Sequence, residues 1–150
     1  MPSAAGVNAA QRALATSPVA GTMAGLGITT VTITATDLSG NSSSSIINVT
    51  VIDVTKPVIT IPSNISLNLN NNCQAIVPDF LGTLVVSDNC TAPGSIIKTQ
   101  TPVAGTVITG ATSTNILIQA TDAGGNMQSV TVLFITQDAT PPVMVCSNTN

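Results

Sequence analysis

The sequence predicts an all-β protein built from antiparallel β-sandwich repeats in tandem, and three observations predict it. Hydrophobic residues make up 43% of the 150 residues but aromatic residues only 1%, so a core must consist of Val, Ile, Leu and Ala. β-Branched residues of this kind prefer strands. Short segments alternate apolar and polar side chains between turn signals, which is typical of half-buried strands. Finally, several motifs recur at one offset along the chain.

The alternating segments define the expected strands in order. Residues 30–36 alternate strictly, and Ile47 and Val49 continue the pattern after a turn. Further along the chain, the same period of two marks residues 65–69, 116–120 and 130–134. Such strands with frequent turns between them are typical of an antiparallel sandwich. Only residues 8–15, which are rich in Ala, allow a short helical turn.

The recurring motifs divide the chain into repeats. Ala-Thr-Asp-x-x-Gly-Asn occupies residues 35–41 and again 120–126, an offset of 85 residues. Asp-x-Thr-x-Pro begins at residues 53 and 138 with the same offset, and Pro-Val-Ala-Gly-Thr begins at residues 18 and 102. A unit of this length can bury a core of its own. We therefore expect the C-terminal part of one repeat at 1–52, a complete repeat at 53–137 and the first strand of the next at 138–150.

The Asp-x-x-Gly-Asn motif lies between two alternating segments in both copies, where a hairpin turn is expected. Aspartate accepts hydrogen bonds from nearby backbone N–H groups, and glycine tolerates the positive φ of such a turn. The residues assigned to this turn motif are Asp37, Gly40, Asn41, Asp122, Gly125 and Asn126.

Composition excludes several classes of function. Only 6% of the residues are charged and only three are basic, too few for the basic patch that nucleic-acid binding needs. No apolar run approaches the length of a membrane span, and the first residues lack the features of a signal peptide. The chain has no His and no Glu, so the usual general bases are absent and no catalytic residue is assigned. We expect a protein that is not an enzyme.

The three cysteines raise the question of a disulfide. A bond between Cys73 and Cys90 would close a loop of 17 residues and stabilise the repeat by about 3 kcal/mol in an oxidising compartment. Buried thiols or a metal site remain the alternatives, although three Cys without His give poor zinc spacing. Cys146 stands where Ile61 stands one repeat earlier, and we expect it to be unpaired.

Calcium is the sharper hypothesis for a binding site. Calcium prefers oxygen ligands, and carboxylates on loops supply them. No dense acidic motif of the EF-hand type exists, so turn capping is favoured over metal binding, and no cofactor is otherwise expected. The weak calcium candidates are Asp53, Asp138, Asp37, Asp122 and Asp88, with Asn89 as a further oxygen donor.

Taken together, these motifs resemble the hyalin repeat (HYR) family. The matching features are the Asp-x-Thr-x-Pro start, Asn-x-Cys ending at Cys73, Ser-Asp-Asn-Cys at 87–90, Pro-x-x-Gly-Thr at 102–106 and the late Ala-Thr-Asp-x-x-Gly-Asn. The resemblance implies an immunoglobulin-like fold and a role in adhesion, as in large surface adhesins and filaments of Bacteroidetes-like bacteria. The family's Cys-Pro is replaced here by Ile61-Pro62 and its late Cys is missing, so its second bridge should be absent.

We therefore expect an extracellular stalk or filament segment of a bacterial surface adhesin. Its partners would be neighbouring repeats of the same protein and other copies in a filament. One alternative is a module that binds carbohydrate or protein, although sugar-binding faces usually present aromatic rings and this chain has two Phe as its only aromatic residues. Another alternative is a subunit that assembles by strand exchange.

Overall fold

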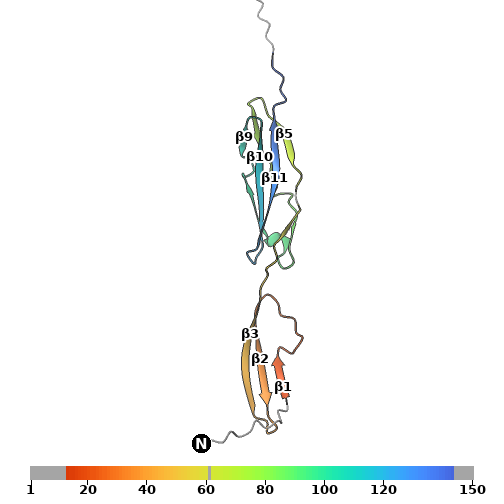
Figure 1. Ribbon diagram of the computed structural model, residues 1–150, viewed down its shortest axis with the longest axis vertical. Coiled ribbons are helices and arrows are strands. Elements are labelled where there is room, and N and C mark those ends of the chain that lie inside the picture. The colour runs from red at the N-terminus through yellow and green to blue at the C-terminus, as the bar shows by residue number, and fades with distance from the viewer. Residues whose placement is uncertain (1–12, 61, 144–150) are drawn as a thin grey trace, which may run out of the picture. The chain divides into compact units, whose positions relative to one another are not determined.

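The structure, a computed structural model, describes residues 13–60 and 62–143 and is all-β, as the sequence predicts (Figure 1). Within residues 13–60 and 62–143, the only helical element is a 3-10 turn, η1 (Pro93–Ser95). Contacts divide the chain into two compact units that meet between Asp53 and Val54. In the described part of the chain, no helix has the length and hydrophobicity that a membrane crossing requires.

The first unit is a single antiparallel sheet of three strands in the order β1-β2-β3. The strands are β1 (Ala13–Ser17), β2 (Gly27–Thr36) and β3 (Ser42–Val51). The helical turn that the Ala-rich stretch allowed is wrong for residues 13–15, because they pair with β2 as part of β1. Tertiary pairing overrides the weak helical preference of alanine here.

The second unit contains one larger sheet and two small ones. The larger sheet has the order β5-β11-β10-β8 and is antiparallel except between β5 and β11, which are parallel. The small sheets pair β4 with β7 and β6 with β9. The strands are β4 (Val58–Ile59), β5 (Ile65–Asn68), β6 (Gln74–Ile76), β7 (Val86–Ser87), β8 (Ile97–Thr101), β9 (Val107–Thr109), β10 (Thr112–Thr121) and β11 (Met127–Gln137). This arrangement is consistent with an immunoglobulin-like sandwich.

The sheet β1-β2-β3 has the same strand order and register as β8-β10-β11. Thr36 pairs with Ser42 in the first unit, and Thr121 pairs with Met127 in the second. The bounds of β2 and β10 differ by 85 residues, and those of β1 and β8 by 84. A cis proline follows β1 and β8 alike, at Pro18 in one unit and Pro102 in the other. The recurring motifs of the sequence therefore occupy equivalent places in the two sheets.

The core of the second unit lies on the inner face of β10 and β11. Ile116, Ile118, Val132 and Phe134 are each 0% exposed. They alternate with more exposed neighbours, as the period of two predicts, and residues of the preceding segment pack over them. Those covering residues are Ile59, Leu69, Ala75, Val77, Phe80, Leu84, Val86 and Ile96.

A buried side-chain amide holds part of the segment that covers this core. Gln100 on β8 is 5% exposed, and its Oε1 accepts a hydrogen bond from the Phe80 N–H at 3.0 Å. Its Nε2 donates to the carbonyl oxygens of Pro78 and Pro102. A buried polar side chain is costly unless such partners satisfy it. Gln100 thus joins the segment before η1 to the larger sheet.

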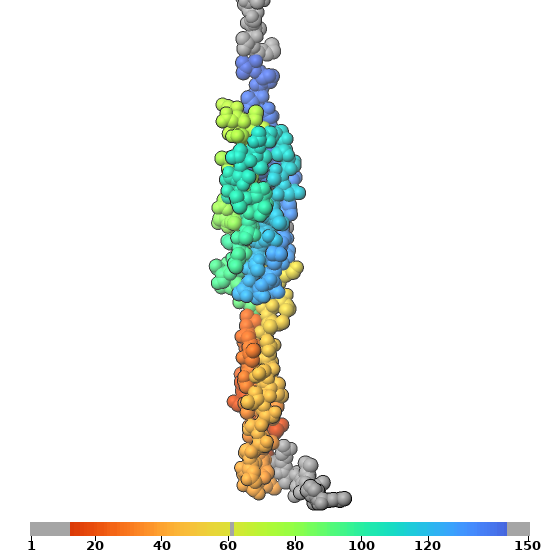
Figure 2. Space-filling model, turned by 90° about the vertical axis from the view of Figure 1, so that its left-hand side faces the viewer, coloured from red at the N-terminus to blue at the C-terminus, as the bar shows by residue number. Residues whose placement is uncertain are grey.

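The corresponding face of the first unit is exposed. Ile47 and Val49 on β3 stand at the positions of Val132 and Phe134, yet they are 51% and 42% exposed. Figure 2 shows the first unit as a thinner body than the second, in keeping with its single sheet. The described first unit thus lacks the layer that residues 54–96 supply in the second.

The opposite face of the first sheet carries hydroxyl and amide pairs in place of charges. Thr34 and Ser44 lie directly across β2 and β3 from each other, with their hydroxyl oxygens 3.0 Å apart. Thr36 and Ser42 form the next such pair at 2.9 Å. Cross-strand pairs of this kind stabilise a sheet by a few tenths of a kcal/mol each, up to about 1 kcal/mol. The chain therefore presents a polar face with very few charged residues.

Candidate metal centre

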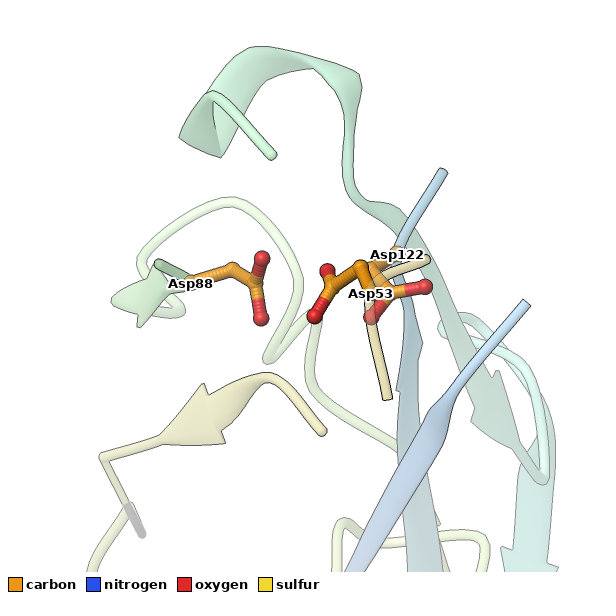
Figure 3. Close-up of side chains that lie close together, drawn as sticks. All are labelled: Asp53, Asp88 and Asp122. Atoms are coloured by element: carbon orange, nitrogen blue, oxygen red, sulfur yellow. The ribbon is translucent and has the colours of Figure 1, made fainter. Parts of the chain in front are cut away.

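Three aspartates converge at one end of the larger sheet of the second unit. Asp53, Asp88 and Asp122 each place a carboxylate oxygen within 4.8 Å of the other two. In Figure 3 the carboxylate of Asp88 points toward those of Asp53 and Asp122. These are three of the five residues that the sequence marks as calcium candidates. The structure thus brings together side chains that lie up to 69 positions apart in the chain.

Asp122 is held by the hairpin turn between β10 and β11. Its Oδ1 accepts a hydrogen bond from the Asn126 N–H, and its Oδ2 accepts one from Asn126 Nδ2, both at 2.8 Å. Gly125 takes the positive φ of 86° that closes the turn. Burial raises the pKa of Asp122, but the hydrogen bonds from Asn126 and the turn backbone outweigh it and hold the pKa below the ordinary value of 3.8. The side chain is therefore a fixed, buried carboxylate.

Asp88 begins the loop that follows β7. Its Oδ2 accepts hydrogen bonds from the N–H groups of Cys90 and Thr91, both at 2.9 Å. Thr91 is buried, and its Oγ1 accepts a hydrogen bond from the Ala123 N–H at 3.1 Å. This bond joins the loop after β7 to the turn after β10 and so sets Asp88 beside Asp122.

The second oxygen of Asp88 is unsatisfied. Asp88 Oδ1 is inaccessible to solvent and accepts no hydrogen bond from the described residues. A buried carboxylate oxygen without a partner loses its hydrogen bonds to water and gains none in exchange, which costs free energy. Such unsatisfied buried acceptors are rare in native proteins.

Asp53 reaches the cluster from the segment that leads into β4. Four residues later Pro57 is buried, and Val58 on β4 then pairs with Ser87 on β7. Asp53 is partly buried, and its Oδ2 is shielded from solvent.

The chemistry of the cluster is that of a hard cation site. All three side chains offer carboxylate oxygens, and oxygens are the ligands that Ca²⁺ and Mg²⁺ take. Three carboxylates this close repel one another when all are ionised, and a divalent cation removes that repulsion. Neither imidazole nor thiolate belongs to the group, so zinc and copper fit it poorly.

The remaining calcium candidates lie elsewhere. Asp37 sits in the β2–β3 turn of the first unit, where it caps the backbone of that turn. Asp138 follows β11, and its Oδ1 accepts a hydrogen bond from the Thr140 N–H at 3.0 Å. Asn89 donates its amide to Cys90 Sγ at 3.1 Å. These residues act as local caps or local partners, as the turn-capping hypothesis expects.

The turn motif is formed in both copies. Asp37 Oδ1 accepts hydrogen bonds from the N–H groups of Ser39 and Asn41, and its Oδ2 accepts one from Asn41 Nδ2. Gly40 has a φ of 88°, which matches Gly125. The hydrogen bonds from Asn41 hold the pKa of Asp37 below its ordinary value. Hairpin capping is thus common to both aspartates, and Asp122 alone joins the cluster.

The predicted disulfide is not formed, and the fold explains why. The carbonyl oxygen of Cys73 accepts a hydrogen bond from the Gly110 N–H, just before β10 begins. Cys90 precedes Thr91, which bonds to Ala123 just after β10 ends. A strand of ten residues is about 30 Å long, whereas a disulfide requires Cα atoms within about 7 Å. The Cys73–Cys90 pairing is therefore wrong for this fold, and Cys146 lies outside the described residues.

Comparison with known proteins gives a limited result. No protein-family model matches the chain. The chain is 30% identical over 125 residues to the serine-rich adhesin for platelets of Staphylococcus aureus. The alignment covers 80% of this chain but only 5% of that adhesin, so the chain spans a small part of the length of its relative. This likeness associates the chain with a bacterial surface adhesin.

Proposed function

We propose that the chain is a structural segment of an extracellular bacterial adhesin, a stalk made of HYR-type modules in tandem. The observation that carries the proposal is the repeated sheet, in which β1-β2-β3 and β8-β10-β11 share their strand order and their register. A module copied along a chain adds length without adding new chemistry. The similarity to an adhesin supports the same role.

The surface chemistry also supports a structural role. Only 6% of the residues are charged, and the polar face of the first sheet is built from Ser, Thr and Asn pairs. Modules with so few charges can follow one another closely without strong repulsion. In this proposal the chain is not an enzyme, and binding to a target belongs to other parts of the adhesin.

Insertion of further modules tests the proposal. One and then two extra copies of residues 53–137 are placed between residues 52 and 53 of the full chain, and the contour length is measured by electron microscopy. A stalk gains the same length with each copy, because every copy folds as its own unit. A single wider particle, with no regular gain in length, would contradict the stalk proposal.

A binding assay separates the stalk from a ligand-binding module. The full chain, coupled to fluorescent beads, is presented to glycan arrays and to extracellular matrix proteins. The stalk predicts no saturable binding above that of uncoated beads. Saturable binding by the full chain, and also by the chains with extra copies, would assign the binding role to the module itself.

A further inference from the structure

We propose that the apolar face of the first sheet (Val31, Ile33, Ile47 and Val49) is a docking surface for the opening half of a further repeat, an extended polypeptide segment of the kind that residues 54–96 form. The second unit supports this occupant, because the same sheet is covered there by such a segment. The inference goes beyond the stalk proposal and does not depend on the adhesin role.

The apolar positions of the first sheet correspond to fully buried positions in the second. Val31 and Ile33 on β2 stand where Ile116 and Ile118 stand on β10, and the latter two are 0% exposed. In the first sheet the same positions are only partly buried, and the two apolar side chains of β3 are more exposed still. Apolar surface removed from water contributes about 25 cal/mol per Å². A covering segment would therefore bind this face favourably.

The face includes a hollow of about 270 Å³. Thr16 and Pro18, the strand residues Val31 and Val49 and the loop residues 19–24 line it, and every residue of this lining is uncharged. Its volume lies near the lower end of the roughly 300–1,000 Å³ of small-molecule pockets. The hollow therefore suits aliphatic side chains inserted from a polypeptide.

In the second unit, Val77 lies against the loop that corresponds to this lining. Val77 is 1% exposed, its N–H donates to the Thr106 carbonyl oxygen, and its own carbonyl oxygen accepts from the Gly105 N–H, both at 2.9 Å. Gly105 and Thr106 belong to the Pro-Val-Ala-Gly-Thr motif that recurs in the β1–β2 loop, where Gly21 and Thr22 are their equivalents. Within the described residues, the Gly21 N–H and the Thr22 carbonyl oxygen form no hydrogen bond. They can therefore form the same two bonds with a docked segment.

The segment around Val77 alternates as a docked strand should. Ala75 and Val77 are 7% and 1% exposed, whereas Ile76 between them is 58% exposed. In strand addition, main-chain hydrogen bonds supply affinity and alternate side chains supply specificity. The occupant of the first sheet should therefore present small aliphatic side chains at alternate positions.

Thr16 distinguishes the first sheet from the second. It occupies on β1 the register position that Gln100 occupies on β8. Gln100 accepts from the Phe80 N–H and donates to the Pro78 carbonyl oxygen of the covering segment. Threonine has no side-chain amide to form both bonds. A segment docked on the first sheet would thus keep the two backbone bonds of the loop but lack this side-chain link.

The experiment is an NMR titration of the ¹⁵N-labelled full chain with a synthetic peptide. The peptide spans residues 54–96 and carries Cys73→Ser and Cys90→Ser, which prevent cross-linking. The amide signals of Gly21 and Val31 should shift saturably, and the Gly21 amide should exchange more slowly with solvent. Gly105 is the internal control, because its N–H already has Val77 as partner and its signal should stay unchanged.

Matched variants test the pose. Val77→Asp in the peptide should abolish the saturable shifts, whereas Ile76→Asp, at the exposed position between the two inward ones, should leave the affinity nearly unchanged. In the full chain, Thr16→Gln should tighten binding about two- to tenfold, the effect of one added hydrogen bond. This gain cannot result from misfolding.

Several results would overturn the proposal. These are the absence of a saturable shift at millimolar peptide, equal binding of the Val77→Asp peptide, unchanged affinity in Thr16→Gln, and shifts confined to Gly105, which would mean exchange into the second unit. A dimer of the full chain that protects the Gly21 amide without peptide would assign the face to a second copy. Binding that appears only after removal of residues 1–12 would assign it to that segment. Each of these results leaves the contour-length test of the stalk unaffected.

Discussion

Asp37 and Asp122 show how one residue type serves two purposes in this chain. Both cap a hairpin turn by accepting hydrogen bonds from the backbone and side-chain N–H groups of an asparagine four residues later. Capping alone explains Asp37, which is exposed. Asp122 is 4% exposed and lies close to a further carboxylate, that of Asp88, so its turn also fixes the position of a buried acidic group.

The pH dependence of the Asp37 turn follows from its hydrogen bonds. The pKa of Asp37 is lowered from 3.8 in the folded chain, first by the side chain of Asn41. The ionised carboxylate therefore stabilises the turn fully above pH 3.8, and this contribution is lost as the pH falls through the lowered value. An NMR titration of the carboxyl groups should show that the pKa of Asp37 lies below 3.8 in the wild-type chain and closer to 3.8 in Asn41→Ala. Equal values in the two chains would contradict this assignment.

Gly125 is predicted to be sensitive to substitution because of its backbone. Its φ of 86° is one that residues with a Cβ rarely adopt, although no atom would obstruct the Cβ itself. Gly125→Ala should therefore destabilise the second unit by about 1 kcal/mol in urea unfolding. Gly124→Ser is the control, since Ser39 occupies that place in the first copy. A loss of stability as large in Gly124→Ser would contradict the backbone explanation.

At the residue scale the sequence predicts the turns better than the cluster. The Asp-x-x-Gly-Asn turn can be predicted from the local sequence, because the hydrogen-bond partners of its aspartate lie within four positions. The meeting of Asp88 with Asp122 depends on the Thr91–Ala123 hydrogen bond, which joins residues 32 positions apart. The Cys73–Cys90 prediction failed for the same reason, since closeness in sequence does not fix distance in a folded sheet.

At the scale of strands, the pair β10–β11 dominates the second unit. It presents fully buried Ile, Val and Phe side chains to one layer of covering segments. The pair β2–β3 repeats the same register with the same apolar positions, but these side chains are half exposed. Equivalent strands therefore differ in stabilising contacts according to what covers them.

This difference predicts unequal effects of equivalent substitutions. Phe134→Ala removes a ring that is 0% exposed and should cost about 3–5 kcal/mol of unfolding free energy. Val49 occupies the same place in the first sheet and is 42% exposed. Val49→Ala should therefore change the free energy of unfolding by no more than about 0.5 kcal/mol. Urea unfolding followed by circular dichroism measures both. Comparable losses in the two variants would contradict the exposure of the first sheet.

The sequence predicts long alternating strands well and short ones poorly. Residues 116–120 and 130–134 lie within β10 and β11 with the expected faces inward. The strands β1 and β8 were missed because Ala-Leu-Ala-Thr-Ser and Ile-Lys-Thr-Gln-Thr show little apolar contrast. The two-residue strands β4 and β7 exist only through their mutual pairing, which no local pattern encodes.

At the scale of the whole molecule, the repeat relates the aspartates of one copy to those of the next. Asp138 stands where Asp53 stands one repeat earlier, and Asp37 stands where Asp122 does. Because Asp53, Asp88 and Asp122 all fall within the repeat at 53–137, we expect the same three aspartates once in each complete repeat.

The central claim is that both units contain one copied sheet, and cross-strand NMR contacts test it most directly. The account predicts backbone contacts between Ile33 and Ser45 and, 85 residues later, between Ile118 and Val130. It predicts the same correspondence for Ser17 with Thr32 and Thr101 with Leu117. Contacts in a different register in either sheet, or helical contacts within residues 112–137, would contradict it.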